Sequence, residues 1–416
     1  MLDRLTNSGL LRGFIMKNII FFSEEINLRA GGPAGYIANL KKGLQLIQND
    51  RIFFIIGSKK NDALRYRKHI SKLLTWWIPA KKLRRHIRER IVDKFLGLNI
   101  DNISLDSPRY KGFVKILDEI DFDSVTCHFV KDALFIRNYL NVRNRNAKII
   151  LMSHSPEPPS REFYATELSN KSEKAEFVLQ LWERIEKEAF EKAADILLFP
   201  SKEAIEPYSS QLDYFESIDK QFLFLPTGCC KLVCDKNTLD FREKYKIKTP
   251  YIISYIGRHN KIKGYDLLKD IAIKVLSTRD DVTFLIGGKP SSDIEPLNHP
   301  RWIELGFVNP PDVLSISDCF ILPNRQTYFD LVLLEVMSMG VPVFASATGG
   351  NKSVYKATQA INLYKDIDEC VEKINAYLDS SIDVKKDLKE KTLKAYNDNY
   401  TLEIFAKNYV KMVESL

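Results

Sequence analysis

The sequence predicts two doubly wound α/β domains that face one another. Its 416 residues exceed what a single hydrophobic core ordinarily organises, and they suit two domains of roughly 150–220 residues each. Both halves alternate short apolar runs with helical stretches, which is typical of βαβ units and a largely parallel sheet. The 45% hydrophobic content excludes a mainly disordered chain.

The first half contains five predicted strands, each bounded by polar or helical stretches. A glycine-rich loop at residues 31–35 precedes a helix predicted over 36–47, and a long region rich in Glu and Lys is predicted to be helical over 163–192. The predicted strands cover residues 17–23, 52–57, 124–129, 148–153 and 196–200.

The second half repeats this alternation after a connection at residues 226–249. Helices are predicted near 264–277, 310–316 and 331–339, and an amphipathic helix covers 401–414. Ligands of doubly wound sheets bind at the carboxyl ends of the strands, so we expect the site in a cleft between the domains. The predicted strands cover residues 251–257, 282–287, 302–305, 319–323 and 341–345.

The formal net charge of +8 comes from one segment. Residues 59–94 hold thirteen Lys or Arg against three acidic residues, so they carry +10 and leave −2 to the rest of the chain. A cluster including Trp76 and Trp77 lies between these cations, which favours a membrane-surface element. A solvated helix pair packed on its domain explains the pattern equally well. Nucleic acid is a weaker third interpretation, because no recognition motif accompanies the charge.

Compartment and metal content are predicted from what the sequence lacks. Asp3, Arg4 and Arg12 interrupt the run that a secretory signal needs, and no uncharged apolar stretch reaches the roughly 20 residues of a spanning helix. The six cysteines do not form a disulfide scaffold, which favours a reducing, cytoplasmic setting. Cys229, Cys230 and Cys234 have no second ligand pair nearby, so free thiols are favoured over a metal site.

A candidate phosphate site follows the strand at 251–257. The segment from Gly257 to Gly264 places Arg258 and Lys263 between a strand and a helix start. Arg258 offers a planar fork and Lys263 a compact charge, and together they can neutralise a diphosphate. Taken alone, such a stretch is more often a basic turn.

The region 324–350 favours the phosphate site over a simple basic turn. It contains a strand end, a loop, a helix bearing Glu335, a Gly-Val-Pro-Val segment and a Gly-Gly turn. Together with G-R-x4-K-G-x2-L-L at 257–268, it resembles the nucleotide-sugar site of GT-B glycosyltransferases, specifically the retaining group called family 4. The resemblance is strong over 251–350 and moderate over 17–230.

The resemblance implies roles for residues of the second domain. Arg258 and Lys263 would bind the donor diphosphate beside Gly257 and stabilise the leaving group. Glu335 would accept hydrogen bonds from the ribose hydroxyls. Backbone N–H groups around Asp330, Leu331 and Val332 would meet phosphate at the helix N-terminus.

The resemblance also implies roles for the first domain and the C-terminal helix. Gly31 and Gly32 match the glycine loop that approaches the donor phosphate or the acceptor. His154 stands where a histidine often touches the donor sugar, although a capped loop histidine is the more common interpretation without the family. Independently of the resemblance, His128 ends a predicted strand and could face the cleft, although a core or loop role is favoured. The helix at 396–416 is expected to cross back to a first domain at 1–228, in which 1–15 are a candidate extension, leaving 229–395 as the second.

Two positions depart from the family pattern. Thr327 replaces a glutamate that normally contacts the transferred sugar, and Asp330 replaces the glycine before the helix. Asp330 is expected to cap that helix, although a carboxylate near a diphosphate is unfavourable unless it points away or binds a sugar hydroxyl. Altered sugar recognition explains the pair, and a degenerate site is the rival explanation.

The expected function is therefore that of a retaining, metal-independent glycosyltransferase without a cofactor. It would transfer a sugar from a nucleotide sugar, with UDP favoured, to a glycan or lipid-linked acceptor in bacterial surface polysaccharide synthesis. We expect a cytoplasmic protein, peripheral on an anionic membrane through 59–94, that binds no nucleic acid. The alternatives are a catalytically weak scaffold that binds a partner or glycolipid, and an epimerase or phosphorylase of similar fold.

Overall fold

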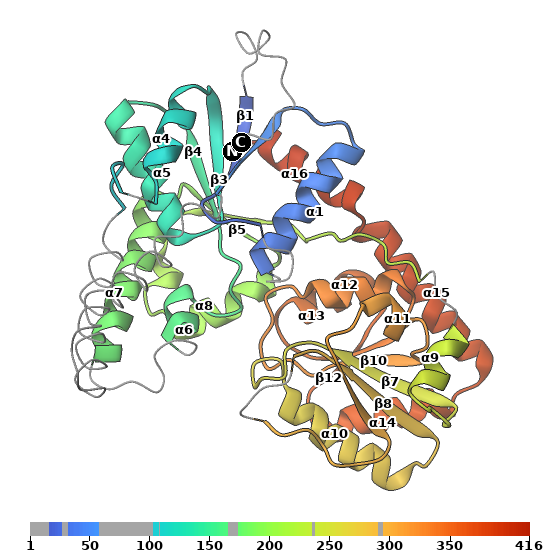
Figure 1. Ribbon diagram of the computed structural model, residues 1–416. Helices are drawn as coiled ribbons and strands as arrows, with labels where there is room; N and C mark the ends of the chain where they lie inside the picture. The colour runs from blue at the N-terminus through green and yellow to red at the C-terminus, as the bar shows by residue number, and fades with distance from the viewer. Residues whose placement is uncertain are drawn as a thin grey trace, which may run out of the picture.

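Two six-stranded parallel sheets form the centre of the protein (Figure 1), which confirms the doubly wound α/β prediction. The structure is a computed structural model, and its strand orders are β2-β1-β3-β4-β5-β6 and β12-β11-β10-β7-β8-β9. The described residues are 16–26, 32–57, 103–107, 109–164, 174–234, 238–289 and 294–416.

The first sheet contains the five predicted strands and one that the sequence pattern missed. The missed strand is β6, at the edge of the sheet; it has only four residues, two of them exposed, and its apolar run of Phe222, Leu223 and Phe224 is short. The six strands are β1 (Met16–Phe22), β2 (Ile52–Ile56), β3 (Phe122–Cys127), β4 (Lys148–Met152), β5 (Ile196–Phe199) and β6 (Gln221–Phe224).

The second sheet likewise contains all five predicted strands and a missed edge strand, β12, of three residues. Its strands are β7 (Tyr251–Ile256), β8 (Val282–Gly287), β9 (Trp302–Gly306), β10 (Cys319–Leu322), β11 (Val343–Ser346) and β12 (Asn362–Tyr364). Its main helices are α10 (Tyr265–Thr278), α11 (Pro310–Leu314), α12 (Leu331–Ser338), α13 (Gly349–Thr358) and α14 (Ile367–Asp379).

The helices of the first domain correct one prediction, because α1 begins at Gly32 rather than at Tyr36. Within the region predicted to be helical at 163–192, the described residues 174–192 are helical. Two consecutive prolines open the separate short helix α6, and a π-helical turn at Ala189–Ala193 follows α7. The helices are α1 (Gly32–Leu46), α4 (Lys111–Asp118), α5 (Val130–Arg143), α6 (Pro159–Phe163), α7 (Lys174–Glu188) and α8 (Glu206–Gln211).

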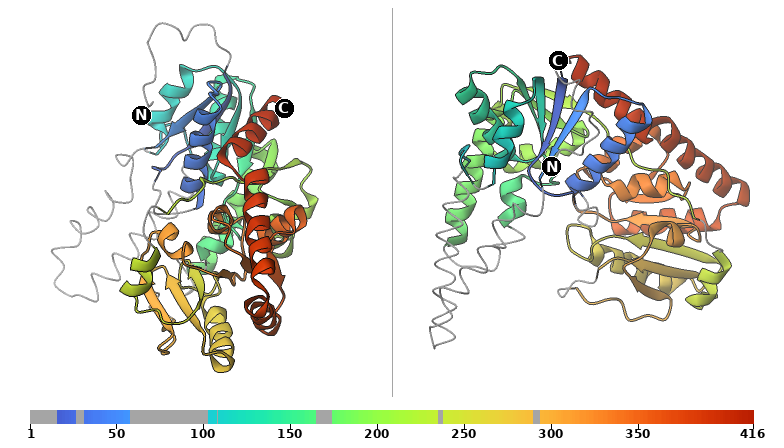
Figure 2. Two further views of the ribbon diagram at one scale, coloured as in Figure 1. Left: turned by 90° about the vertical axis from the view of Figure 1, so that its right-hand side faces the viewer. Right: turned by 45° about the horizontal axis from the view of Figure 1, so that its top comes forward.

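The last two helices, α15 (Ile382–Asn399) and α16 (Leu402–Glu414), run from the second domain onto the first. Figure 2 shows α16 alongside α1, and a Cβ at Gly43 of α1 would lie 2.4 Å from the Leu402 carbonyl oxygen. The hydroxyl of Tyr409 lies 2.9 Å from Asn18 Oδ1 and 2.7 Å from Thr126 Oγ1. Helix α16 is therefore part of the first domain's core.

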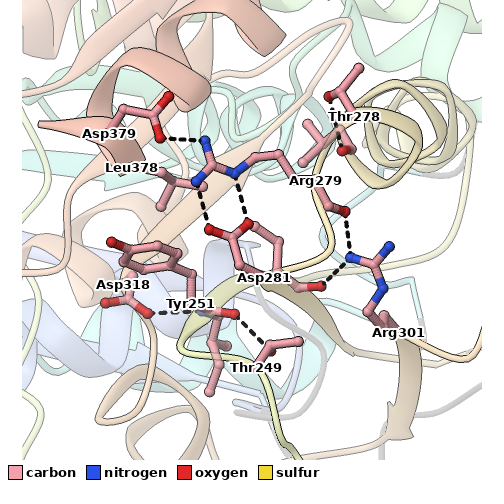
Figure 3. A network of polar contacts seen from close by, with 12 residues as sticks. Thr249, Tyr251, Thr278, Arg279, Asp281, Arg301, Asp318, Leu378 and Asp379 are labelled. Atoms are coloured by element: carbon pink, nitrogen blue, oxygen red, sulfur yellow. Dashed lines mark hydrogen bonds and ion pairs between the residues drawn. The ribbon is translucent and has the colours of Figure 1, made fainter.

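A polar network stabilises the amino ends of the strands of the second sheet (Figure 3). Arg279 donates to both carboxylate oxygens of Asp281, at 2.9 and 2.7 Å, and to Asp379 at 2.7 Å. Asp318 accepts a 2.8 Å hydrogen bond from the Ile252 amide. Arg279 thus neutralises Asp281 and Asp379, and a backbone amide hydrogen-bonds Asp318. These contacts lie at the amino ends of the strands, opposite to the predicted site.

Several sequence predictions fall outside the described residues. These are the extension at 1–15, Gly31 and the basic segment 59–94, so the membrane hypothesis stays a prediction. In the part of the chain that the structure does describe, no helix has the length and apolar character needed to cross a bilayer.

Candidate functional site

The carboxyl ends of the two sheets meet at the interface between the domains. Tyr328 follows β10 of the second domain, and its ring centroid lies 5.9 Å from that of Phe199 and 6.3 Å from that of His154. Phe199 ends β5 and His154 follows β4, so both belong to the first domain. The two halves of the chain therefore contact each other at the strand ends where the site was predicted.

Ion pairs join the domains beside this interface. Lys356 and Lys352 of α13 contact Glu203 and Glu206 at 2.5 and 2.6 Å. Close to the start of α1, a Cβ at Gly35 would lie 2.9 Å from Leu331 Cδ1, at the start of α12. The glycine-rich start of α1, which includes Gly32, therefore adjoins the first turn of α12, as the expected donor site requires.

Two glycines shape the loops of the second domain. Gly264 has a φ of +67°, and a Cβ there would lie 1.8 Å from the Pro323 carbonyl oxygen. Gly349 has a φ of +38°, and a Cβ there would lie 1.9 Å from the Thr327 carbonyl oxygen. Only glycine combines these dihedrals with such close backbone approach. The two contacts bring the Lys263 loop and the Gly-Gly turn against the loop after β10.

The two predicted phosphate-binding cations have different surroundings. Arg258 is exposed beside Gly257, and its guanidinium makes no hydrogen bond or ion pair with a described residue. Lys263 is largely buried, and its Nζ lies 2.6 and 2.7 Å from the two carboxylate oxygens of Asp330. Arg258 is therefore free to bind an anion, whereas Lys263 already has one.

Asp330 does not have the predicted capping role. It stands at the N-cap position of α12, but its carboxylate accepts no hydrogen bond from that helix. Its oxygens instead accept from Lys263 and from the Asn324 amide. Burial alone would raise the pKa of Asp330, but Lys263, Asn324 and Arg258 outweigh it and hold the pKa below its usual value.

Glu335 lies in the middle of α12 with a mostly buried side chain. Its carboxylate makes no hydrogen bond or ion pair with the residues that the structure describes. Burial, helped by the negative charge of Asp330, raises the pKa of Glu335 to about 7. A carboxyl group without a partner at this place can accept hydrogen bonds from a ligand.

His154 belongs to an aromatic cluster of the first domain. Its Nε2 lies 2.7 Å from Nδ1 of His128, so one ring donates a hydrogen bond to the other. The ring of Tyr36 lies 4.9 Å from His154 and 5.6 Å from His128, between centroids. Burial lowers the pKa of His128 to about 3 and lowers that of His154 as well. Both histidines are therefore neutral near pH 7, which suits hydrogen bonding to a hydroxyl group.

Several buried polar atoms of the two domains have no hydrogen-bond partner. Such atoms are normally paired, yet thirteen in the described residues are not; six of these follow β3, follow β10 or lie at the Gly-Gly turn, and a seventh belongs to Tyr36 of α1. A polyhydroxylated ligand would supply partners for such atoms. The seven are Tyr36 Oη, His128 Nε2, Asn324 Oδ1, Gln326 Oε1, Thr327 Oγ1, Tyr328 Oη and Asn351 Oδ1.

The structure adds residues that sequence reasoning had not assigned to the site. His128 was expected in the core or in a loop, and it is buried, but it also contacts His154 directly. Tyr36 and Asn324 carried no recognisable signal, because their roles depend on contacts between distant segments. Thr327, which was predicted from the sequence, has a hydroxyl group without a hydrogen-bond partner, and its carbonyl oxygen lies against Gly349.

No metal site is evident in the part of the chain that the structure covers. There, no three His, Cys, Asp or Glu side chains are arranged to hold an ion. All six cysteines lie outside disulfides, including Cys229, Cys230 and Cys234.

Sequence comparison relates the second domain to glycosyltransferases. Residues 250–380 match the family model described as glycosyl transferases group 1. The alpha-D-kanosaminyltransferase of Streptomyces kanamyceticus is 28% identical over 133 residues, which cover 29% of this chain and 34% of that protein. The sulfoquinovosyl transferase SQD2 of Arabidopsis thaliana is 28% identical over 136 residues, covering 30% and 26%. The chain thus spans about a third of the length of the curated relatives it matches, or less.

Structural similarity extends over nearly the whole chain. The sucrose-phosphate synthase of Thermosynechococcus elongatus superposes with a TM-score of 0.64 at 15% identity, covering 96% of this chain and 98% of that chain. Anabaena HepE in complex with UDP and glucose has a TM-score of 0.62 at 14% identity, covering 96% and 99%. The chain has the GT-B fold. The site described above lies between the two domains of this GT-B protein, on the loops that follow their strands.

Proposed function

We propose that this GT-B protein is a retaining glycosyltransferase that uses a nucleoside-diphosphate sugar, with UDP favoured. The observation that carries the proposal is that Lys263 contacts Asp330 at the uncapped N-terminus of α12 and that Arg258 is close enough to lower the pKa of the same carboxyl group. Two cations and free backbone N–H groups are what a diphosphate needs. The complex of HepE with UDP and glucose supports the preference for UDP.

The proposed mechanism relies on leaving-group stabilisation. Negative charge develops on the nucleoside diphosphate as the glycosidic bond breaks, and Arg258 and Lys263 would stabilise it. The acceptor hydroxyl would attack from the same face, without a protein nucleophile or a metal ion. His154 would hold a sugar hydroxyl as a neutral hydrogen-bonding group, positioned by His128. Glu335 would accept hydrogen bonds from the ribose.

The proposed acceptor is a glycan or a lipid-linked glycan in bacterial surface polysaccharide synthesis. A cytoplasmic location, peripheral on an anionic membrane, fits the basic segment at 59–94. A second candidate is a catalytically weak scaffold, which Thr327 and Asp330 favour because they replace a sugar-binding glutamate and a glycine of the resembled family. Binding of nucleotide sugars separates the two functions.

A donor screen tests the proposal. Titration calorimetry of the full chain with UDP-, GDP-, dTDP- and ADP-sugars is expected to show binding of at least one donor, because the Arg258 guanidinium makes no hydrogen bond or ion pair with a described residue. Release of the nucleoside diphosphate with a glycan acceptor present would then establish transfer. If no nucleotide or sugar nucleotide binds, the scaffold function is favoured instead.

Donor binding is expected to depend on pH through Glu335. The ionised carboxylate would accept hydrogen bonds from the ribose hydroxyls, and its pKa is about 7, so donor affinity should increase between pH 6 and pH 8, by roughly tenfold for each unit that binding lowers this pKa. Calorimetry at pH 6, 7 and 8 measures this. Sugar nucleotides are phosphodiesters and do not titrate in this range. The Glu335→Gln variant should flatten the profile, and a flat wild-type profile would contradict the role.

The same group should affect stability with the opposite trend. Its pKa in the folded protein is raised above the usual 4.5, so the folded state holds the proton more tightly than the unfolded chain. The contribution of Glu335 to the free energy of unfolding therefore decreases as pH rises from about 4.5 to about 7. Comparing wild type with Glu335→Gln isolates this contribution.

A further inference from the structure

Asp330 places a negative charge inside the site proposed for a diphosphate. Its side chain is 17% exposed, and both oxygens contact the Nζ of Lys263, at 2.6 and 2.7 Å. A third contact comes from the Asn324 amide. The carboxylate is thus fixed by three hydrogen bonds from two residues, in a site that also contains the cations Arg258 and Lys263 and the carboxyl group of Glu335.

The orientation of Asp330 leaves the N-terminus of α12 open. A residue at the N-cap position usually accepts a hydrogen bond from its own helix, but the Asp330 carboxylate makes none and is held by Lys263 instead. The backbone N–H groups of Leu331 and Val332 therefore keep their positive potential for a ligand. The carboxylate also neutralises much of the charge on Lys263, so the site is less cationic than its two basic residues suggest.

We propose that Asp330 is a specificity-determining residue that disfavours the nucleoside diphosphate product relative to the sugar-nucleotide donor. The inference rests on the proposed function and deepens it. The proposal explains the presence of a carboxylate that would otherwise only weaken phosphate binding.

The physical basis is the charge difference between donor and product. A terminal phosphate has a second pKa near 6, so a nucleoside diphosphate carries about one more negative charge at pH 7.5 than its sugar ester. A fixed carboxylate a few ångströms away repels this additional charge. The donor, in which the second phosphate is esterified, is repelled less. Asp330 would thereby speed release of the product and limit its inhibition of the enzyme.

Calorimetry of the Asp330→Asn variant tests the inference. The wild type is first titrated at pH 7.5 with four pairs of ligands: UDP and UDP-glucose, GDP and GDP-mannose, dTDP and dTDP-glucose, ADP and ADP-glucose. The pair that it binds is then titrated into the variants. We expect the dissociation constant of the diphosphate to fall roughly five- to tenfold more than that of its sugar ester. Asp330→Gly, which restores the glycine of the resembled family, should shift the ratio in the same direction and serves if the first variant does not fold.

Asp379→Asn is the matched control, because it also removes one carboxylate of an ion pair but lies at the opposite edge of the sheet. It should leave the ratio unchanged. Equal changes for both ligands in the Asp330 variants, or a larger gain for the sugar ester, would overturn the inference while leaving the proposed function standing. If the wild type binds no member of any pair, the proposed function fails and the inference fails with it.

Discussion

Replacing Lys263 by alanine is expected to lower turnover by about 100-fold or more, because the ammonium group would stabilise the departing diphosphate. The measurement is release of nucleoside diphosphate with donor and acceptor present. Lys261→Ala is the matched control, since Lys261 is an exposed lysine of the same loop. Unchanged turnover in Lys263→Ala would refute the assignment of this site.

The same substitution is expected to lower stability, and a double variant separates the two effects. Without Lys263, the mostly buried Asp330 carboxylate keeps only its hydrogen bond from Asn324, and loss of a partner from such a pair costs about 3–5 kcal/mol. Lys263→Ala combined with Asp330→Asn removes both charges, so its thermal midpoint should recover most of the loss. Its turnover should stay low, and recovery of turnover would show that Lys263 acts only by structural support.

Replacing Gly264 by alanine is expected to destabilise the second domain by about 2–4 kcal/mol and to weaken donor binding. Its φ of +67° disfavours any side chain, and the new Cβ would lie 1.8 Å from the Pro323 carbonyl oxygen. The loop that carries Lys263 would therefore have to move away from the loop after β10. Denaturant unfolding and donor calorimetry measure the two effects.

Two other glycines provide the controls for this prediction. Gly306 has a similar φ of +66° but open space around it, so Gly306→Ala should lose only about 1 kcal/mol, from backbone strain. Gly112 lies near the start of α4 with nothing near its Cβ position, so Gly112→Ala should be neutral or stabilising. Equal losses for Gly264→Ala and Gly306→Ala would contradict the proposed close contact.

The elements that the sequence pattern identified are those with strong local signals. The apolar runs of β7 and β8 are buried along their length, so hydrophobicity and length alone indicate strands. Strands β6 and β12 have only four and three residues and lie at the sheet edges, so their apolar runs are too short to be recognised, and they were missed. Of the region predicted to be helical at 163–192, the described residues 174–192 are helical, and the helix ends at Ala193, close to the predicted end.

The residues of the candidate site likewise fall into those that a local sequence pattern identified and those that only tertiary contacts revealed. Arg258, Lys263 and Glu335 were found because their spacing within one stretch of chain resembles a known pattern. The contact between His154 and His128 and the contact of Tyr328 with the first domain join segments far apart in the sequence. No local pattern reports such contacts.

Asp330 shows most clearly what each source of information determined. The sequence by itself established a two-domain α/β chain, the strand ends where a ligand binds, and an aspartate where a glycine was expected. It suggested a helix cap, because capping propensity is a local property. Only the tertiary structure brought Lys263 and Asn324 within hydrogen-bond distance of that carboxylate. A charge–charge contact at this distance outweighs the local preference, so Asp330 turns away from its helix and changes the charge of the site.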